Sequence, residues 1–129
     1  MRPIRVLVVE DSRYAADLNI RQLKKSGFDV EHQMATDETS MESALVNQPW
    51  DLILSDNCMP TFTALGALAV RNRLSPHTPF IIVTEHMMEH EINHAYSQGL
   101  TAFVSKADLS DLGLFAQKIL SEYRIQIYK

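Results

Sequence analysis

The chain has 129 residues, of which 46% are hydrophobic and 22% charged, which is the composition of one globular domain with a packed core. Its formal net charge of −4 excludes a strongly basic protein that binds nucleic acid or a membrane surface through charge. No apolar stretch is long enough to span a bilayer, and the charged N-terminus does not resemble a signal peptide. With Cys58 as the single cysteine, we expect one cytoplasmic domain, residues 1–129, without an internal disulfide.

The first half of the chain predicts two strands, each followed by a helix. An apolar run at 4–9 predicts the first strand, and a helix from about Ser12 ends at Gly27 after two lysines. The run at 29–35 alternates apolar and polar residues, which predicts a strand at the edge of a sheet. A weaker helical pattern covers residues 38–46.

The second half of the chain repeats this pattern three times. Strands are predicted at 51–55, 80–84 and 102–106, and each is almost continuously apolar, as in parallel strands covered on both faces. One helix is predicted after Pro60, and another at 87–98, ending before Gly99. The last helix, with a cap at Asp108 or Ser110, has the clearest apolar stripe, formed by Leu112, Phe115, Ala116, Ile119 and Tyr123.

Strand and helix alternate five times, which favours an α/β fold. Connections between parallel strands are right-handed, so the helices must cover both faces of one parallel sheet. We therefore predict a single doubly wound (βα)5 domain.

Polar side chains stand at the ends of four predicted strands. They are Glu10 and Asp11 after the first strand, Asp56 after the third, Thr84 and Glu85 at the fourth and Lys106 at the fifth. Carboxyl ends of parallel strands meet at one edge of a sheet, where ligands bind. Two like charges about 4 Å apart repel by roughly 4 kcal/mol at an effective dielectric of 20, so a hard divalent cation such as Mg²⁺ suits this acidic cluster.

Asp56 ends a strand that is otherwise fully apolar. A buried carboxylate is costly unless a cation lies beside it, and Lys106 or a metal ion would supply that cation. The same cations would neutralise the oxygens of an approaching phosphoryl group. Asp56 is therefore a candidate nucleophile that forms an acyl phosphate.

Four segments, "VLVVEDS", "DLILSDNCMP", "IIVT" and "AFVSK", closely resemble, in this order and at similar separations, the receiver domain of bacterial response regulators. The resemblance covers essentially the whole chain. It implies a flavodoxin-like sheet of five parallel strands in the order 2-1-3-4-5. It also implies a role in two-component signal transduction.

By this resemblance, Asp56 accepts a phosphoryl group from the phosphohistidine of a histidine kinase or a phosphotransfer protein. Mg²⁺, or Mn²⁺, would be bound by Asp11 and Asp56, by Glu10 through water, and by the backbone carbonyl of Cys58. The reaction is self-catalysed phosphotransfer and dephosphorylation, not turnover of an external substrate.

The resemblance also assigns the residues of a switch. Thr84 and Lys106 would bind phosphoryl oxygens, and Phe103 occupies the position of the switching aromatic residue. The surface formed by the fourth helix, the fifth strand and the fifth helix would then contact an output domain, a target protein or a second copy of the chain.

The sequence departs from the family pattern at three places. Ala107 follows Lys106 where the family has a proline, so we expect a trans peptide bond or a rearranged loop. The segment "TFTAL" replaces a glycine-containing loop, and the start of the third helix is expected to differ. Glu85 replaces a small residue, and we expect it, Cys58 and His86 to tune the lifetime of the phosphoryl group.

Two other functions are weighed against the phosphoacceptor hypothesis. A receiver-like binding module independent of phosphorylation is the main alternative, because of Ala107 and Glu85. A haloacid-dehalogenase-like phosphohydrolase needs an acid two residues after its nucleophile, where this chain has Cys58, and also a cap insertion. Regulation by oxidation of Cys58 is disfavoured because the chain has no resolving cysteine.

Three histidines, His86, His90 and His94, have the spacing of one helix face. Such a face could bind a transition metal. We prefer the interpretation of a solvated or partner-contacting face.

Overall fold

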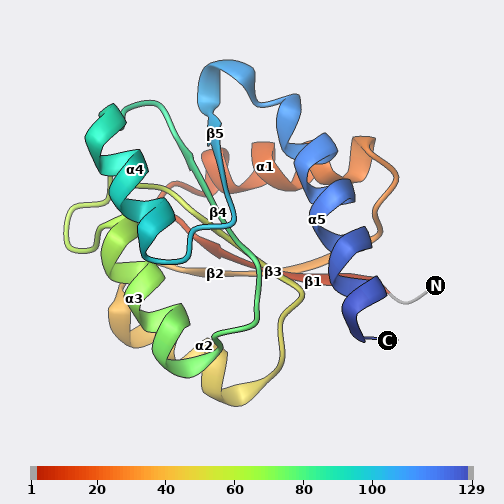
Figure 1. Ribbon diagram of the computed structural model, residues 1–129, viewed down its shortest axis with the longest axis horizontal. Coiled ribbons are helices and arrows are strands. Elements are labelled where there is room, and N and C mark those ends of the chain that lie inside the picture. Colours follow the sequence, from red (N-terminus) through yellow and green to blue (C-terminus); the bar gives the residue numbers. More distant parts are fainter. Residues whose placement is uncertain (1–2, 128–129) are drawn as a thin grey trace.

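The computed structural model describes the backbone of residues 3–127 and the side chains of residues 3–122. Five parallel strands form one sheet in the order β2-β1-β3-β4-β5 (Figure 1). Their bounds are Ile4–Val9 for β1, Val30–Ala35 for β2, Leu52–Ser55 for β3, Phe80–Thr84 for β4 and Ala102–Ser105 for β5. The predicted α/β fold, the flavodoxin-like order and the edge position of the second strand are thus confirmed.

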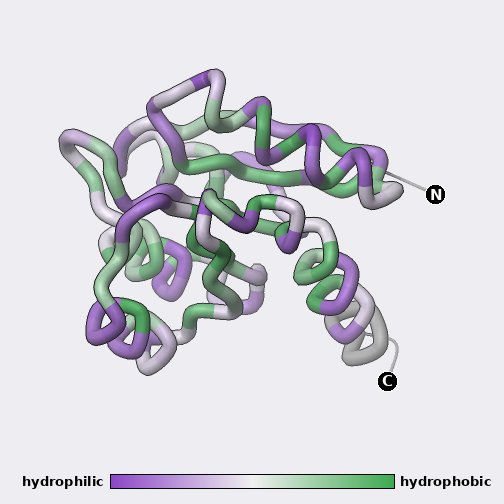
Figure 2. The backbone as a smooth tube through the Cα atoms, turned by 90° about the horizontal axis from the view of Figure 1, so that it is seen from above, coloured by the Kyte–Doolittle hydropathy of each residue, from purple (hydrophilic) through white to green (hydrophobic). Residues whose placement is uncertain are grey.

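Helices cover both faces of the sheet, as Figure 1 shows. Their bounds are Arg13–Lys25 for α1, Glu38–Asn47 for α2, Ala64–Leu74 for α3, Glu89–Ser97 for α4 and Asp111–Ile127 for α5, with a short 3₁₀ helix, η1, at Lys106–Asp108. Helices α1 and α5 pack on one face, and α2, α3 and α4 on the other. The helix colouring in Figure 2 alternates between apolar and polar residues, as expected for helices with one face on the sheet.

Two separate cores explain why the strands are almost continuously apolar. Successive side chains of a strand point to opposite faces of the sheet. In β1, Val6 and Val8 enter the core under α1 and α5, whereas Leu7 and Val9 enter the core under α2 and α3. Every position of a central strand is therefore buried by one helical layer or the other.

The helix ends follow from local chemistry. Ser12 caps α1, because its Oγ accepts a hydrogen bond from the backbone N–H of Ala15 at 3.2 Å. Gly27 follows the end of α1 with a φ of +98°, a backbone conformation that favours glycine. Thr63 caps α3 by accepting a hydrogen bond from the N–H of Gly66 at 3.0 Å, so the helix forms although "TFTAL" lacks the glycine-containing loop.

Two predicted boundaries near the carboxyl edge are wrong. Helix α4 begins at Glu89, because the Glu91 carboxylate accepts a hydrogen bond from the Met88 N–H at 3.0 Å, so His86 lies before the helix. Strand β5 ends at Ser105, whose Oγ accepts a hydrogen bond from the Ala107 N–H at 3.2 Å and starts η1. The described chain contains no cis peptide bond, so Lys106 and Ala107 are joined in trans.

The predicted apolar stripe of α5 is partly wrong. Leu112 and Ala116 are buried as predicted, but Phe115 is 39% exposed, and Leu120 lies in the core instead. The side chain of Tyr123, also predicted in this stripe, lies outside the described residues. The buried side of α5 includes Gly113, which lies so near Ser26 at the end of α1 that an added Cβ would lie 1.6 Å from Ser26 Oγ.

The buried Arg71 joins the loops at the opposite edge of the sheet. Its guanidinium donates to the carbonyl of Thr78 at 3.1 Å and to the carbonyl of Gly99. The guanidinium also lies over the aromatic ring of Phe80, with Arg71 Cζ 5.8 Å from the ring centroid. Burial lowers the pKa of Arg71 from its ordinary value. The side chain thereby anchors the C-terminal ends of α3 and α4 to each other.

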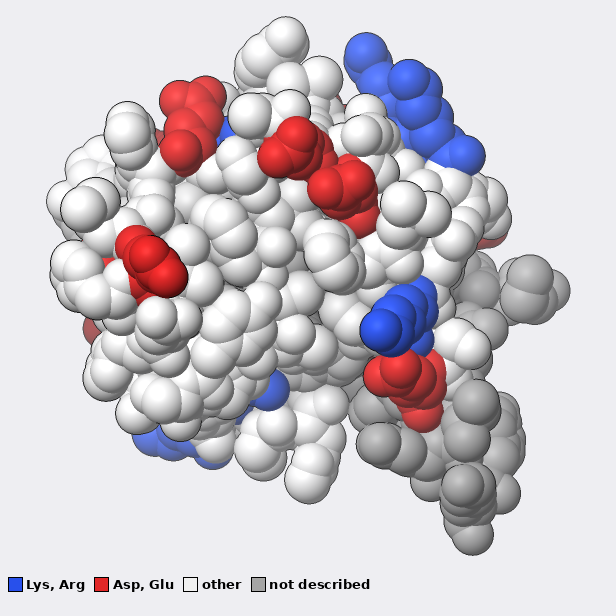
Figure 3. All heavy atoms as spheres, turned by 45° about the horizontal axis from the view of Figure 1, so that its top comes forward, with Lys and Arg blue, Asp and Glu red and all other residues white. Residues whose placement is uncertain are grey.

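The charged side chains in Figure 3 form no continuous basic patch on the described surface in view, because the lysines and arginines there are separated from one another. Within the described part of the chain, no helix has both the length and the apolar composition needed to cross a membrane.

Substituting Gly113 tests the contact between α1 and α5. We expect Gly113→Ala to lower the free energy of unfolding by about 1–3 kcal/mol, because its Cβ overlaps Ser26. In a Ser26→Gly background the same change should instead stabilise the helix, since alanine is favoured over glycine in a helix by about 1 kcal/mol. Urea unfolding of the four proteins measures both effects. An equal effect in the two backgrounds would contradict this account.

Candidate functional site

Three carboxylates meet where β1 and β3 end. The backbone ladder continues one residue past each strand, because Glu10 N–H donates to Ala35 at 3.0 Å and Asp56 N–H donates to Val9 at 3.0 Å. These bonds hold both residues in line with the sheet. One carboxylate oxygen each of Glu10, Asp11 and Asp56 lies within 4.8 Å of the others. Glu10 and Asp56 are buried, whereas Asp11 is exposed.

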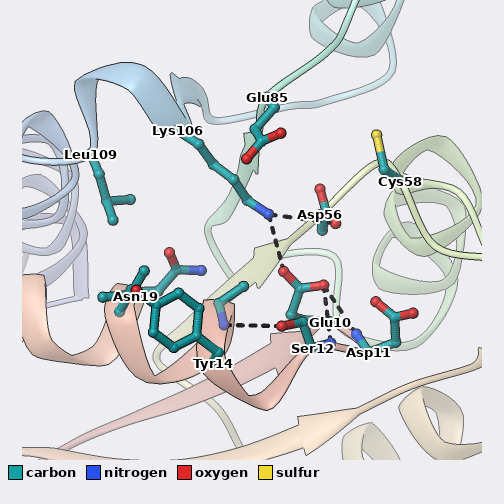
Figure 4. Close-up of a pocket in the computed structure, with 12 residues that line it drawn as sticks. Glu10, Asp11, Ser12, Tyr14, Asn19, Asp56, Cys58, Glu85, Lys106 and Leu109 are labelled. Atoms are coloured by element: carbon teal, nitrogen blue, oxygen red, sulfur yellow. Dashed lines mark hydrogen bonds and ion pairs between the residues drawn. The ribbon is translucent and has the colours of Figure 1, made fainter.

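Lys106 reaches across from the end of β5 to this acidic cluster, as Figure 4 shows. Its Nζ lies 3.2 Å from Glu10 Oε1 and 3.7 Å from Asp56 Oδ2. The first residue of η1 therefore supplies the cation that the sequence predicted beside Asp56. The side chain of Lys106 is largely buried, so water screens this attraction only in part.

The charges in the cluster shift the pKa of two of its members. Burial raises the pKa of Glu10, the charge of Asp56 adds to this rise, and the ion pair with Lys106 opposes it without cancelling it. For Lys106, burial favours the neutral amine, but the carboxylates of Glu10, Asp56 and Glu85 together raise its pKa. The carboxylates therefore carry more negative charge than one lysine neutralises.

The two oxygens of Asp56 have different neighbours. Oδ1 accepts a hydrogen bond from the N–H of Asn57 at 2.8 Å, and Oδ2 lies toward Lys106. Asn57 in turn accepts a hydrogen bond from the N–H of Ala64, the first residue of α3, at 3.3 Å. The loop after β3 is thereby tied to the start of α3, and this orients the Asp56 carboxylate.

Thr84 lies beneath the site rather than in its wall. It is fully buried, and its Oγ1 lies 3.7 Å from the Sγ of Cys58. The Cys58 thiol itself is exposed and lines the pocket beside Asp56. Thr84 thus contacts a residue that lines the pocket without lining the pocket itself.

A pocket of about 410 Å³ opens beside the cluster. Of the residues predicted from the sequence, the structure brings six into its wall, namely Glu10, Asp11, Asp56, Cys58, Glu85 and Lys106. Phe103 lies elsewhere, half-buried against the core under α2, α3 and α4. His86 is exposed just before α4.

Six further residues line the pocket that the sequence analysis did not select as site residues. They are Ser12, which caps α1, Tyr14, Ala15, Leu18 and Asn19 of α1, and Leu109 after η1. The sequence does contain a signal for Asn19. It is a polar residue on the otherwise apolar stripe of α1, beside Ala16 and Ile20. Their place in the pocket depends on how α1 packs against the loop after β5, which no motif in the sequence reveals.

The chemistry of the acidic cluster suits a hard divalent cation. All three of its ligand groups are carboxylates, and Mg²⁺ prefers oxygen ligands while keeping several of its waters. The exposure of Asp11 leaves room for such waters. Among the described residues this is the only cluster of at least three potential ligands close enough for one ion, and none of His86, His90 and His94 belongs to it.

Comparison with known proteins assigns the family. The model of the response regulator receiver domain matches residues 6–114. The chain therefore belongs to this family and is a receiver domain of two-component signal transduction. It is 27% identical over 113 residues to the hybrid signal transduction histidine kinase G of Dictyostelium discoideum, and 29% identical over 101 residues to the transcription factor SKN7 of Saccharomyces cerevisiae. These matches cover 84% and 78% of this chain but only 3% and 16% of the two relatives.

Solved structures share the fold. A CheY-like receiver domain protein from Methanospirillum hungatei superposes with a TM-score of 0.83 at 23% identity, covering 97% of this chain and 99% of that one. The phosphorylated cyanobacterial phytochrome response regulator RcpA gives a TM-score of 0.75 at 21% identity, covering 95% of this chain and 94% of that one. The family match and these structures confirm the resemblance inferred from the four sequence segments.

The raised pKa of Glu10 predicts how stability depends on pH. A raised pKa in the folded chain stabilises the fold fully below the ordinary value of 4.5, and this stabilisation is lost as the pH rises through the folded pKa. In EDTA, we therefore expect the wild type to lose stability relative to Glu10→Gln as the pH rises above 4.5 and through the raised pKa of Glu10, as urea unfolding would show. Mg²⁺ should restore part of this loss at neutral pH.

The control for this prediction is Glu122→Gln, at an exposed glutamate of α5. Its stability should follow that of the wild type at every pH. A constant difference between wild type and Glu10→Gln across the range would show that the pKa of Glu10 is not raised.

Proposed function

We propose that this receiver domain accepts a phosphoryl group on Asp56, in a Mg²⁺-dependent reaction, from the phosphohistidine of a histidine kinase or phosphotransfer protein. The observation that carries the proposal is the position of the Asp56 carboxylate. It belongs to the acidic cluster, its Oδ2 lies 3.7 Å from the Lys106 ammonium, and it lines an open pocket. Membership of the receiver family supports the same reaction.

Each residue of the site has its own role in the proposed phosphoryl transfer. A carboxylate oxygen of Asp56 attacks phosphorus, the P–N bond to the donor breaks, and its electron pair returns to the ring nitrogen. The Asn57 N–H holds Oδ1 of Asp56, and Lys106 is placed to neutralise a phosphoryl oxygen near Oδ2. Mg²⁺ or Mn²⁺, held by Asp11, Asp56, the Cys58 carbonyl and, through water, Glu10, would supply further charge neutralisation.

Thr84 and Phe103 are the proposed switch. The hydroxyl of Thr84 contacts the Cys58 thiol and would turn from it toward a phosphoryl oxygen. Such a turn opens space next to β5, where the half-buried ring of Phe103 would enter. Phosphorylation would thereby bias the arrangement of α4, β5 and α5.

The surface of α4, β5 and α5 is the proposed partner surface. Tyr96 of α4 is 47% exposed, and its hydroxyl accepts a hydrogen bond from the N–H of Phe103 at 3.1 Å. A movement of β5 is therefore transmitted to α4. An output domain, a separate target protein and a second copy of this chain are all compatible partners, and the long relatives contain comparable receiver regions within larger proteins.

The wall of the pocket is proposed to set the lifetime of the phosphoryl group. Glu85 and Cys58 line the pocket on either side of Asp56, and the exposed His86 follows Glu85 in the chain (Figure 4). A carboxylate at this place repels the anionic donor and any incoming hydroxide. We therefore propose that Glu85 slows both phosphorylation and hydrolysis.

The direct test is treatment with acetyl phosphate and Mg²⁺, followed by intact mass spectrometry. We expect the wild type to gain one phosphoryl group, which Asp56→Asn should abolish, since an amide cannot form the acyl phosphate. Beryllofluoride should shift the NMR signals of Thr84 and Phe103 in the wild type alone.

Asp29→Asn is the matched control, because Asp29 is an exposed aspartate at the opposite edge of the sheet. It should be phosphorylated like the wild type. If a folded wild type forms no adduct and shows no Mg²⁺-dependent shift, the phosphoacceptor proposal fails in favour of a binding module independent of phosphorylation.

Removing the charge of Glu85 should speed phosphorylation. We expect both Glu85→Gln and Glu85→Ala to raise the initial rate with acetyl phosphate several-fold, because repulsion of the dianion is removed. The gain should shrink at high ionic strength, where charges are screened. A gain seen only in Glu85→Ala would instead assign the effect to the size of the side chain.

A further inference from the structure

Lys106 is held over the acidic cluster by a turn that has little packing of its own. The turn is the 3₁₀ helix η1, and none of its three residues is buried. Of these residues, Lys106 alone lines the pocket, and Figure 4 shows its side chain extending from the turn toward Glu10 and Asp56. Because no core contact fixes this backbone, the place of the lysine depends on the bonds at the two ends of the turn.

The two ends of the turn are held in different ways. At the far end, Leu109 packs against the core under α1 and α5, and its carbonyl accepts a hydrogen bond from the N–H of Leu112 at 3.0 Å. At the near end, Ser105 is the last residue of β5, and its Oγ accepts a hydrogen bond from the N–H of Ala107 at 3.2 Å. This bond spans Lys106, so it fixes the direction in which the lysine leaves the strand.

The bond exists because residue 107 is not a proline. Ala107 supplies the N–H, whereas a proline at this position, as in the family pattern, would have none. A proline would also disfavour a helical conformation of the residue before it, and Lys106 begins η1. This chain therefore holds its lysine with a side-chain hydroxyl where the family pattern has a rigid ring.

We propose that Ser105 is a positioning residue for phosphoryl transfer, which holds the Lys106 ammonium at the site through the hydrogen bond to Ala107. The proposal rests on the phosphoacceptor function of Asp56 and deepens it. An ammonium stabilises the charge of the transition state best when it is already in place, and a displacement of about 1 Å slows a reaction strongly. Without the bond the turn opens more often, so fewer molecules have Lys106 beside Asp56 at any moment.

Ser105 does not itself reach the reacting atoms. It is not among the residues that line the pocket, and its Oγ bonds the backbone of the turn. Its effect on the reaction must therefore pass through Lys106, and must vanish when residue 106 has no ammonium. A residue that only stabilises the fold would change the free energy of unfolding without this dependence on Lys106.

The experiment measures the initial rate of phosphorylation by acetyl phosphate with saturating Mg²⁺, by intact mass spectrometry. We expect Ser105→Ala to lower this rate about fivefold, the effect of losing one hydrogen bond. Ser105→Thr, which keeps the hydroxyl, should retain the wild-type rate. The matched control is Ser110→Ala, at an exposed serine shortly after η1, which should also keep the wild-type rate.

A second background separates positioning from a general effect. In Lys106→Met, adding Ser105→Ala should not change the rate further, because no ammonium is left to position. An unchanged rate in Ser105→Ala, or an equal loss in both backgrounds, overturns the positioning role while leaving the phosphoacceptor proposal intact. Failure of the folded wild type to be phosphorylated would overturn both proposals together.

Amide hydrogen exchange of the unphosphorylated protein tests the bond without any turnover. Ala107 is exposed, so its N–H should exchange rapidly unless the Ser105 hydroxyl protects it. We expect protection in the wild type and in Ser105→Thr, and exchange several-fold faster in Ser105→Ala. An unprotected Ala107 N–H in the wild type overturns the inference, whatever the rates of the variants.

Discussion

The arrangement of this molecule depends on one ion pair, the Lys106 ammonium held against Glu10 and Asp56. Three carboxylates near one another repel, and two of them are buried. Burial and the charge of Asp56 together keep the pKa of Glu10 raised, although the lysine lowers it. The three carboxylates outnumber the one lysine, so this edge of the sheet suits a further cation.

The fold provides this arrangement by extending its strands. β1 and β3 continue their ladder one residue into Glu10 and Asp56, which fixes the backbone of both residues. Their carboxylates then accept hydrogen bonds from the next N–H in the chain, of Asp11 and of Asn57. Lys106 begins a 3₁₀ turn that the hydroxyl of Ser105 stabilises. The loop after this turn and the first two turns of α1 then form the other wall of the pocket, where Asn19 lies.

Much of the site was predictable because it depends on chain order at the ends of strands. Asp56 and Lys106 both follow apolar runs, and parallel strands bring such positions to one edge. Thr84 follows the same rule, yet it does not line the pocket, and its hydroxyl contacts the thiol of Cys58. Which side of α5 is buried, leaving Phe115 exposed, was not predictable from periodicity. The buried side includes Gly113, which lies close to Ser26, a residue far from it in the sequence.

The sequence by itself determined the alternation of strands and helices, the parallel sheet and the group of acidic residues and lysine at one edge, because these depend on local periodicity and on the polarity of strand ends. The tertiary structure alone decided that Lys106 lies close to both Glu10 and Asp56, that the Thr84 hydroxyl contacts the Cys58 thiol, and that Asn19 lines a pocket. These features depend on distances between side chains from different elements. Such distances are set by how α1 and α5 pack on the sheet, and no single segment of the chain encodes them.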